Sequence, residues 1–286
     1  MWALSLTGPP VWTEIATTVS MPLSAGPYGS HSIIDGQHLI QLQSTSSPVW
    51  MLDLAGPSIF TPLSTENTLA MPLFIGNVVL DAPMRRLVFF GANVGGRYLP
   101  DPFALSLSNP ATWNAIMPPG DMSSPGMTER IVVADAPRRR LIVFGQNGSP
   151  AETTLWALAL SEPPVWSRLA ATGRGPYRSM GNEGAYDPLG QRLLVFTPSE
   201  FDPAGGGGGA GGAPPDGGED VRPQVFALSL SGDPVWNRLA TRGETPRWFR
   251  RRPVYDEGND RLLFFGGHNV DAYTNDVWAL DLASCR

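Results

Sequence analysis

A pair of aromatic residues ten positions apart recurs five times along the chain. The best copy is Leu155–Leu169, where Trp156 and Trp166 flank a Ser-Glu-Pro-Pro turn. Before the turn, bulky residues alternate with small ones, which is the period of a β-strand. A spacing that is kept while the intervening residues change predicts two strands joined by a fixed turn. The other pairs are Trp2 with Trp12, Trp50 with Phe60, Phe103 with Trp113 and Phe226 with Trp236, and a sixth copy begins at Trp278.

The distance between copies predicts the architecture. Aligned on the middle leucine of the first strand, successive copies are 48, 53, 53, 70 and 52 residues apart. Repeats of about 50 residues built from short strands are typical of β-propeller blades, so we expect one all-β domain over residues 1–286. The long gap contains a glycine-rich run, and we predict that residues 203–220 are a flexible insertion between two strands of one blade. The aligned leucines are Leu4, Leu52, Leu105, Leu158, Leu228 and Leu280.

A second hairpin lies between successive aromatic units, and in four copies an Asp precedes an Arg by five residues. The Asp can accept hydrogen bonds from turn amides, and the Arg can reach back to it across the hairpin. Four copies cannot all be active sites, so we interpret the motif as structural. A shorter first hairpin turns at Asp35-Gly36 instead. The four pairs are Asp81 with Arg86, Asp135 with Arg140, Asp187 with Arg192 and Asp256 with Arg261.

The repeat resembles the kelch-repeat β-propellers, which include the central domain of galactose oxidase. The last repeat carries the resemblance best, with Phe265-Gly266-Gly267 followed by Asn275–Leu282. In the other repeats the glycine pair has changed, for example to Gly91-Ala92. The resemblance implies four-stranded antiparallel blades, five of them by our strand count. In a closed ring of five, Val11–Ile15 would complete the last blade; six blades with one incomplete, or a truncated larger propeller, are the alternatives.

Composition narrows the classes of function. The net charge of −6 argues against nucleic-acid binding, because phosphate affinity comes from clustered cations. Cys285 is the only cysteine, which excludes an internal disulfide and a thiolate metal cluster. No apolar run approaches the roughly 20 residues of a membrane-spanning helix, and no signal peptide is visible. We expect a monomer without membrane insertion. The sequence does not assign a localisation, and an extracytoplasmic location is compatible with it if the N-terminus is truncated.

The residues that differ between repeats indicate where a ligand would bind. In an up-and-down blade, the connections after the second and fourth strands open at one end, and these are the irregular ones here. A rigid scaffold with varied loops is how such folds gain specificity. The segment Pro246–Arg252 is rich in arginine and aromatic residues, although its arginines could instead pair with acids on adjacent blades. The candidate ligand-binding residues are Tyr28, Arg97, Tyr98, Arg174, Tyr177, Arg178, Arg247, Trp248, Arg250, His268 and Tyr273.

Catalytic signals are thin. The three histidines, His31, His38 and His268, are too scattered to indicate a metal site. The resemblance to copper oxidases of the galactose oxidase type would require a Cys crosslinked to Tyr, and Cys285 next to the last residue argues against it. We therefore predict no catalytic residue, metal or cofactor, and a non-catalytic module that binds a protein or glycan. The alternative is a carbohydrate-active enzyme, either an isomerase like the kelch-type sialate epimerases or an oxidase.

Overall fold

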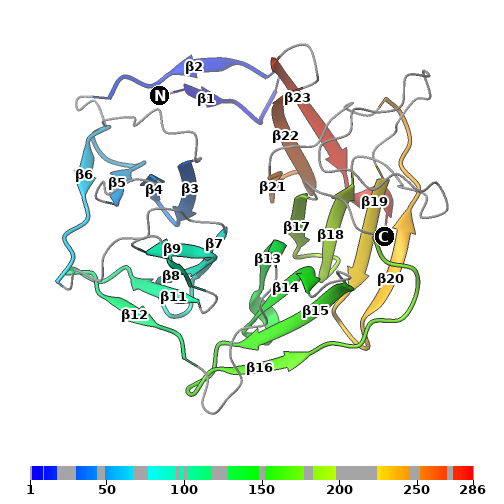
Figure 1. Cartoon of the computed structure of the whole chain (residues 1–286). Helices are drawn as coiled ribbons and strands as arrows, with labels where there is room; N and C mark the ends of the chain where they lie inside the picture. The colour runs from blue at the N-terminus through cyan, green and yellow to red at the C-terminus, as the bar shows by residue number, and fades with distance from the viewer. Residues whose placement is uncertain are drawn as a thin grey trace. The chain divides into compact units, whose positions relative to one another are not determined.

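The computed structural model describes residues 2–8, 10–17, 30–43, 49–66, 77–94, 97–99, 102–117, 128–147, 152–176, 183–197, 224–244, 252–268 and 273–285. These residues form antiparallel β-sheets and two short 3-10 turns, η1 (Ala136–Arg138) and η2 (Ala283–Cys285). The expected all-β class is confirmed. The chain divides into two compact units, Met1–Ser124 and Pro125–Arg286 (Figure 1). The predicted insertion at residues 203–220 lies outside the described residues.

Unit 1 contains two four-stranded sheets, called blades 1 and 2, and two short two-stranded ribbons among its described residues. Blade 1 consists of β3 (Ser30–Asp35), β4 (His38–Gln43), β5 (Trp50–Asp53) and β6 (Phe60–Pro62). Blade 2 consists of β7 (Asn77–Asp81), β8 (Arg86–Phe90), β11 (Phe103–Ser106) and β12 (Trp113–Ala115). The ribbons pair β1 (Trp2–Leu4) with β2 (Trp12–Glu14), and β9 (Ala92–Val94) with β10 (Arg97–Leu99).

Unit 2 contains blades 3, 4 and 5. Blade 3 consists of β13 (Thr128–Asp135), β14 (Arg140–Asn147), β15 (Glu152–Ala159) and β16 (Val165–Arg168). Blade 4 consists of β17 (Glu183–Asp187), β18 (Arg192–Thr197), β19 (Gln224–Ser229) and β20 (Val235–Leu239). Blade 5 has three strands among the described residues, β21 (Val254–Asp256), β22 (Arg261–His268) and β23 (Tyr273–Asp281).

Within each unit the blades pack face to face, with the first strands of neighbouring blades side by side. β3 lies next to β7, and β17 lies next to both β13 and β21. The apolar second strands, such as Leu193–Phe196, supply side chains to both faces of their sheet, so one blade contributes to two cores. Blades 3 and 4 share one such core and blades 4 and 5 share the next. The described residues therefore form five antiparallel blades, which pack within each unit as neighbouring blades of a β-propeller do.

The repeated aromatic of the fourth strand lies opposite the middle leucine of the third strand in every copy that has both strands. In the four-stranded blades this aromatic is buried, with 2% to 8% of its surface exposed. In the β1–β2 ribbon, Trp2 and Trp12 are 61% and 44% exposed, so our expectation of buried aromatics is wrong there. A two-stranded ribbon covers a side chain on fewer sides than a blade does. The register pairs are Leu4 with Trp12, Leu52 with Phe60, Leu105 with Trp113, Leu158 with Trp166 and Leu228 with Trp236.

The pairing of β2 differs from the one that a closed ring of five complete blades would require. Such a ring needs Val11–Ile15 as the fourth strand beside β23. Instead β2 pairs with β1, in the register Trp2 to Glu14 and Leu4 to Trp12. Local hairpin formation between neighbours in sequence closes a shorter loop than pairing across the whole chain.

Candidate functional site

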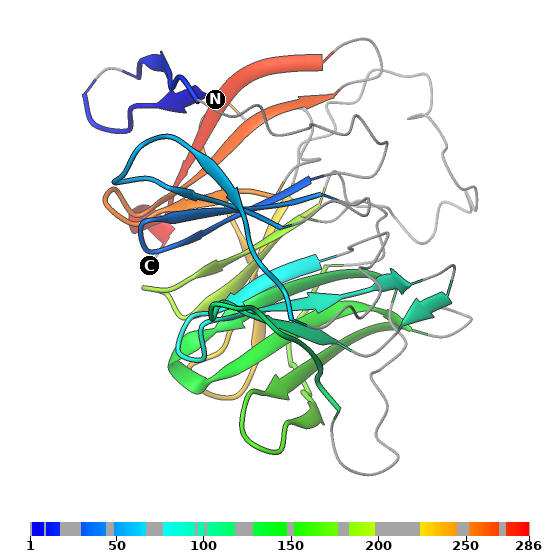
Figure 2. The ribbon, with the colours of Figure 1, turned by 90° about the vertical axis from the view of Figure 1, so that its left-hand side faces the viewer.

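The two ends of each blade differ in regularity. Consecutive strands are antiparallel neighbours, so the connections after the first and third strands lie at one end, called the turn end. The connections after the second and fourth strands lie at the other, called the loop end. In Figure 2 the turns β17–β18 and β21–β22, together with η2, lie on one side of unit 2. The sequence-based assignment of uniform and irregular connections to opposite ends of the blade is confirmed by this strand order.

The turn end repeats one ion pair in four blades. In each, the arginine Nε donates to the aspartate Oδ2 at 2.8 Å, and the aspartate is almost completely buried. The structural interpretation of the motif agrees with this geometry, since every carboxylate is engaged by its own hairpin. The pairs are Asp81 with Arg86, Asp135 with Arg140, Asp187 with Arg192 and Asp256 with Arg261.

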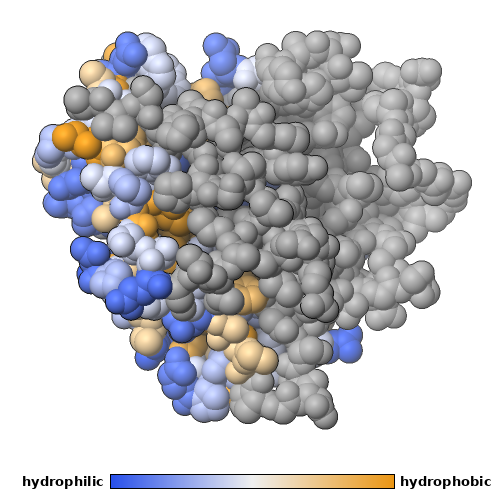
Figure 3. Space-filling view, turned by 60° about the vertical axis from the view of Figure 1, so that its left-hand side comes forward, coloured by the Kyte–Doolittle hydropathy of each residue, from blue (hydrophilic) through white to orange (hydrophobic). Residues whose placement is uncertain are grey.

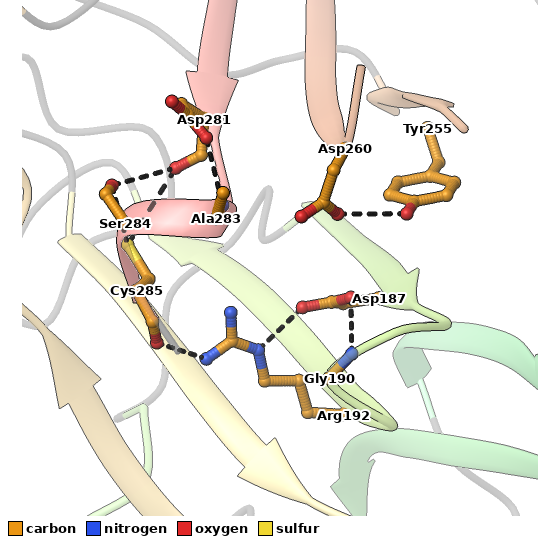
Figure 4. Close-up of polar contacts among 9 residues, drawn as sticks. All are labelled: Asp187, Gly190, Arg192, Tyr255, Asp260, Asp281, Ala283, Ser284 and Cys285. Atoms are coloured by element: carbon orange, nitrogen blue, oxygen red, sulfur yellow. Dashed lines mark hydrogen bonds and ion pairs between the residues drawn. The ribbon is translucent and has the colours of Figure 1, made fainter. Parts of the chain in front are cut away.

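The same arginines also tie neighbouring blades together. Arg192 Nη1 donates to the carbonyl oxygen of Cys285 in η2 at 3.0 Å, while its Nε holds Asp187 (Figure 4). In blade 3, Asp135 Oδ1 accepts a hydrogen bond from the Tyr186 hydroxyl of blade 4 at 3.0 Å. Burial and the charge of Asp135 raise the pKa of Tyr186, so its hydroxyl keeps its proton and remains a donor. These contacts brace the turn end and leave it little capacity for a ligand.

Residues at the start of the first strands give the loop end its chemical variety. The position four residues before the repeated aspartate lies at or near the start of the first strand in four blades, whereas in blade 3 it is Ile131, a buried residue inside the longer β13. It is polar in four of them, and its charge and size change from blade to blade. The residues are His31, Asn77, Ile131, Glu183 and Arg252. The sequence analysis missed Glu183 and Asn77 as a group; counting back from the aspartate would have found them.

Glu183 and Arg252 interact electrostatically across the boundary between blades 4 and 5. Glu183 is half-buried, and desolvation by burial raises the pKa of its carboxyl, with the charge of Arg252 opposing that rise. Arg252 retains accessible surface, but the protein around its guanidinium lowers its pKa by desolvation. For this arginine of the Pro246–Arg252 cluster, the pairing with an acid on an adjacent blade agrees with our alternative interpretation. The pair is a polar, partly desolvated feature at the loop end of unit 2.

Two predicted residue pairs lie on hairpins that extend from the loop end. Arg97 and Tyr98 are in β10, opposite Val94 and Asn93 of β9, so the second connection of blade 2 ends in a ribbon. In blade 5, His268 and Tyr273 are direct register partners at the ends of β22 and β23. The structure thus brings His268 and Tyr273 together at the backbone level. The sequence analysis treated both segments as irregular connections between strands.

Arg174 lies elsewhere, on the link between blades 3 and 4. Thr172 forms a bridge with Val235, and its carbonyl accepts from the backbone N–H of Trp236 at 2.8 Å. Gly173 and Gly175 allow this approach, since a Cβ on either would collide with the Trp236 backbone or ring. Arg174 is therefore an exposed residue beside the fourth strand of blade 4, whereas Glu183 starts the first strand of that blade. The predicted residues Tyr28, Tyr177, Arg178, Arg247, Trp248 and Arg250 lie outside the described residues.

Metal binding and membrane insertion were the two other kinds of feature sought among the described residues. Among the described residues, no group of three or more His, Cys, Asp or Glu side chains is arranged to hold a metal ion. None of their helices is long and apolar enough to cross a membrane. In Figure 3 hydrophilic and hydrophobic residues are interspersed over the described part of the face shown. The candidate sites are therefore the loop ends of the two units, each taken by itself. Unit 2 contributes Glu183, Arg252 and the β22–β23 hairpin, and unit 1 contributes the β9–β10 ribbon.

Comparison with known proteins shows a similarity to a solved structure. No protein-family model matches the chain, and no curated protein matches it. Among solved structures, the chain is similar to the β-propeller domain of the Trilobed protease from Pyrococcus furiosus, which was described as having an open velcro topology. The two are 11% identical, and the match covers 89% of this chain and 69% of the other, with a TM-score of 0.43.

Proposed function

We propose that the protein is a non-catalytic interaction module that binds a protein or glycan ligand through the loop end of its blades. The observation that supports this most is the contrast between the two ends. Four blades share one ion-pair geometry at the turn end, whereas the matching loop-end position is His, Asn, Glu or Arg in four blades and the buried Ile131 in blade 3. A repeat that keeps its frame and varies one exposed end is suited to recognition.

The chemistry of unit 2 favours a polar ligand that carries charge. Glu183 and Arg252 share a partly desolvated setting, where a hydrogen bond to a charged group is stronger than in water. A ligand with a carboxylate or several hydroxyl groups can exchange partners with this pair. Arginine suits carboxylates because its planar fork of donors matches their geometry.

We further infer that the blades are of the kelch type. Gly266 has φ +65°, and a Cβ there would lie 2.9 Å from the carbonyl oxygen of Thr274. The register of β22 and β23 shifts between Phe265 and Gly267, so this glycine allows a bulge that other residues would strain. Gly91 directly follows β8 and has a similar φ of +69°. A physical need for glycine after the second strand agrees with the Phe-Gly motif of that family.

A binding screen with matched variants tests the proposal. The whole chain is immobilised and screened on a glycan array and against extracellular and cytosolic protein extracts. Each hit is then measured with Glu183→Ala/Arg252→Ala and with Arg85→Ala, a turn-end arginine that is 66% exposed. We expect the loop-end variant to weaken binding about tenfold or more, the loss of one charge-assisted contact, and the turn-end variant to bind like the parent. Hits that depend on Arg85 and ignore Glu183 and Arg252 would contradict the proposal.

A further inference from the structure

The side chain of Glu183 lies at the edge of an apolar core. Glu183 begins β17 and is the register partner of Phe196 in β18, so the two side chains are on the same face of blade 4. Phe196 is fully buried in the core that blades 4 and 5 share, where its ring meets that of Phe264 edge-on with the centroids 5.0 Å apart. Glu183 therefore emerges beside packed aromatic rings, which accounts for the desolvation of its carboxyl.

Arg252, an exposed arginine of blade 5, is the cation that interacts with Glu183. It precedes β21, and β21 lies next to β17. Among the described residues, no donor forms a hydrogen bond with the Glu183 carboxylate. The charge of Arg252 is therefore the interaction that favours ionised Glu183 against the cost of desolvation.

The other charged and titratable residues on the strands packed against Glu183 lie in two places. Near the loop end, Ile131 of β13 lies against Gly184, and the two residues before it, Glu129 and Arg130, are opposite in charge. At the turn end, the acids and tyrosines of β13, β17 and β21 and the arginine of β18 each form a hydrogen bond or ion pair. These turn-end residues are Asp135, Tyr186, Asp187, Arg192, Tyr255 and Asp256. A change of protonation at the loop end of unit 2 therefore points to Glu183.

The two members of the pair differ in how they can lose their charge. An arginine keeps its proton in proteins, whereas a desolvated carboxylate is easily neutralised by one. A cationic ligand at Glu183 would compete with Arg252 for the carboxylate, and the guanidinium could not respond by losing its charge. An anionic ligand at Arg252 would compete with Glu183, which can respond by taking up a proton. The pair therefore favours exchange with an anion.

Protonation also changes what Glu183 can bind. A neutral carboxyl group has an O–H donor, whereas the ionised group only accepts hydrogen bonds. Hydrogen bonds from an O–H to a carboxylate are short and strong. A ligand carboxylate has two oxygens, so one can accept from Arg252 and the other from neutral Glu183.

From these observations we propose that the loop end of unit 2 binds a carboxylate group of its ligand, with Arg252 donating to one oxygen and Glu183, which takes up a proton from solvent on binding, donating to the other. This inference rests on the function proposed above and narrows the ligand to an acidic sugar or an acidic peptide.

The proton taken up makes the affinity depend on pH. Below the pKa of Glu183 in the free protein its carboxyl is already neutral, and binding takes up no proton. The affinity falls as pH rises through that pKa, which burial has raised above 4.5, and levels off above the still higher pKa of the complex. The ligand is therefore held more tightly at mildly acidic pH than at alkaline pH.

Calorimetric titration of the whole chain tests the site with two pairs of probes. One pair is an oligomer of galacturonic acid and the neutral galactose oligomer of the same length, and the other is a peptide with one glutamate and the same peptide with glutamine. Titration at about pH 5.5 and about pH 8, each in two buffers of different ionisation enthalpy, gives the affinity and the protons taken up. We expect one acidic probe to bind at least about tenfold more tightly than its neutral partner and to lose about tenfold in affinity at the higher pH. Which acidic probe binds distinguishes a sugar from a peptide.

Three variants assign the effect to residues. Glu183→Gln cannot titrate and keeps a donor, so it should bind the acidic probe equally at both pH values and without proton uptake. Arg252→Met removes the charge and should weaken binding at least about tenfold at both pH values. Arg85→Met removes an exposed arginine of the turn end and should bind like the parent.

Failure of this inference is distinguishable from failure of the proposed function. Absence of binding by both acidic probes, an affinity of the parent that does not change with pH, or proton uptake that persists in Glu183→Gln would overturn the inference. A neutral ligand whose binding depends on Glu183 and Arg252 would also overturn it, but would support the proposed function. Ligands that bind only at the turn end would contradict both.

Discussion

At the scale of single residues, Asp187 shows how the repeated motif acts. Its side chain is fully buried, and its two oxygens accept hydrogen bonds from the backbone N–H of Gly190 and from Arg192 Nε, each at 2.8 Å. The arginine in turn reaches the carbonyl of Cys285. One carboxylate therefore fixes its own turn and orients the donor that joins blade 4 to blade 5.

Substitution of Asp187 tests this role. Asp187→Asn removes the charge opposite Arg192, and we expect the free energy of unfolding to fall by about 3 kcal/mol, as when one partner of a buried ion pair is lost. Asp53→Asn is the control, because Asp53 is exposed and its oxygen accepts only a turn N–H within the part of the chain described here, a bond that asparagine can keep. Urea unfolding measures both variants. Equal losses would contradict the assigned role.

The pH dependence of stability separates two acidic residues. Burial raises the pKa of Glu183 above 4.5, so the folded protein loses stability as pH rises through that higher pKa. We expect Glu183→Gln to gain stability relative to the parent as pH rises from 4 to 8.

Hydrogen bonds from Asn259 and Arg261 lower the pKa of Asp256 below 3.8, so the stability that its ionised form contributes is present above pH 3.8 and is lost as pH falls through the folded pKa. Asp256→Asn should therefore be least stable relative to the parent at neutral pH, and the difference in free energy of unfolding should shrink in acid. Urea unfolding across this pH range measures both variants, and a difference that does not change with pH for either one would contradict the assignment.

At the scale of elements, the link between blades 3 and 4 depends on close backbone contact. Thr172 forms a bridge with Val235 at the start of β20. The link between blades 1 and 2 forms an equivalent bridge between Thr65 and Ala111. The links thus hold the fourth strand of the blade that they lead into. In the link between blades 3 and 4, Gly173 is required by this contact as well as by its φ of +80°.

Two glycine variants distinguish these causes. Gly173 has φ +80° and lies against the Trp236 carbonyl, so Gly173→Ala should cost about 3 kcal/mol or more from backbone strain and collision together. Gly243 has φ +88° with no atom of the described residues within 4 Å of a built Cβ, so Gly243→Ala should cost about 1 kcal/mol, the strain alone. Thermal unfolding of both variants measures the difference. Similar losses of stability in the two variants would contradict the proposed contact of residue 173 with Trp236.

The sequence predicted the elements well where a pattern repeats. The aromatic spacing gave the register of the third and fourth strands, and the Asp-x4-Arg motif gave the turn between the first and second. The prediction failed where the place of a residue in the fold, and not its local sequence pattern, decides whether it is buried and which residues it contacts. Trp12 has the same sequence context as Trp166 but lies in a two-stranded ribbon and is exposed. Glu183 went unnoticed because its partner Arg252 is far away in sequence and becomes a neighbour only through blade packing.

At the scale of the whole molecule, each blade depends mainly on the blades beside it. Blade 4 contributes to two cores, one with blade 3 and one with blade 5. Stability in such a repeat is close to a sum of blade and interface terms. A long connection between two strands of one blade therefore changes the free energy of unfolding little, provided that the two strands stay paired.

Deletion of the glycine-rich run tests that expectation. Thr197 and Gln224 are register partners at the ends of β18 and β19, so a short connection can close this hairpin. Removal of residues 205–218 should change the free energy of unfolding by less than about 1 kcal/mol, since loop-closure entropy varies slowly with length. Calorimetry of the shortened chain measures it. A large loss would show that these residues contribute contacts to the folded state.

The blade-to-blade bonds at the turn end have a consequence for how such a chain can diverge. Arg140 reaches the backbone oxygen of Leu230 at 3.5 Å, and Arg192 reaches that of Cys285 at 3.0 Å. Every amino acid supplies the same peptide oxygen, so the accepting position can mutate without loss of the bond. Only the arginine and its paired aspartate must be kept together. Duplicated blades can therefore diverge in sequence while each still forms its hydrogen bond to the next blade.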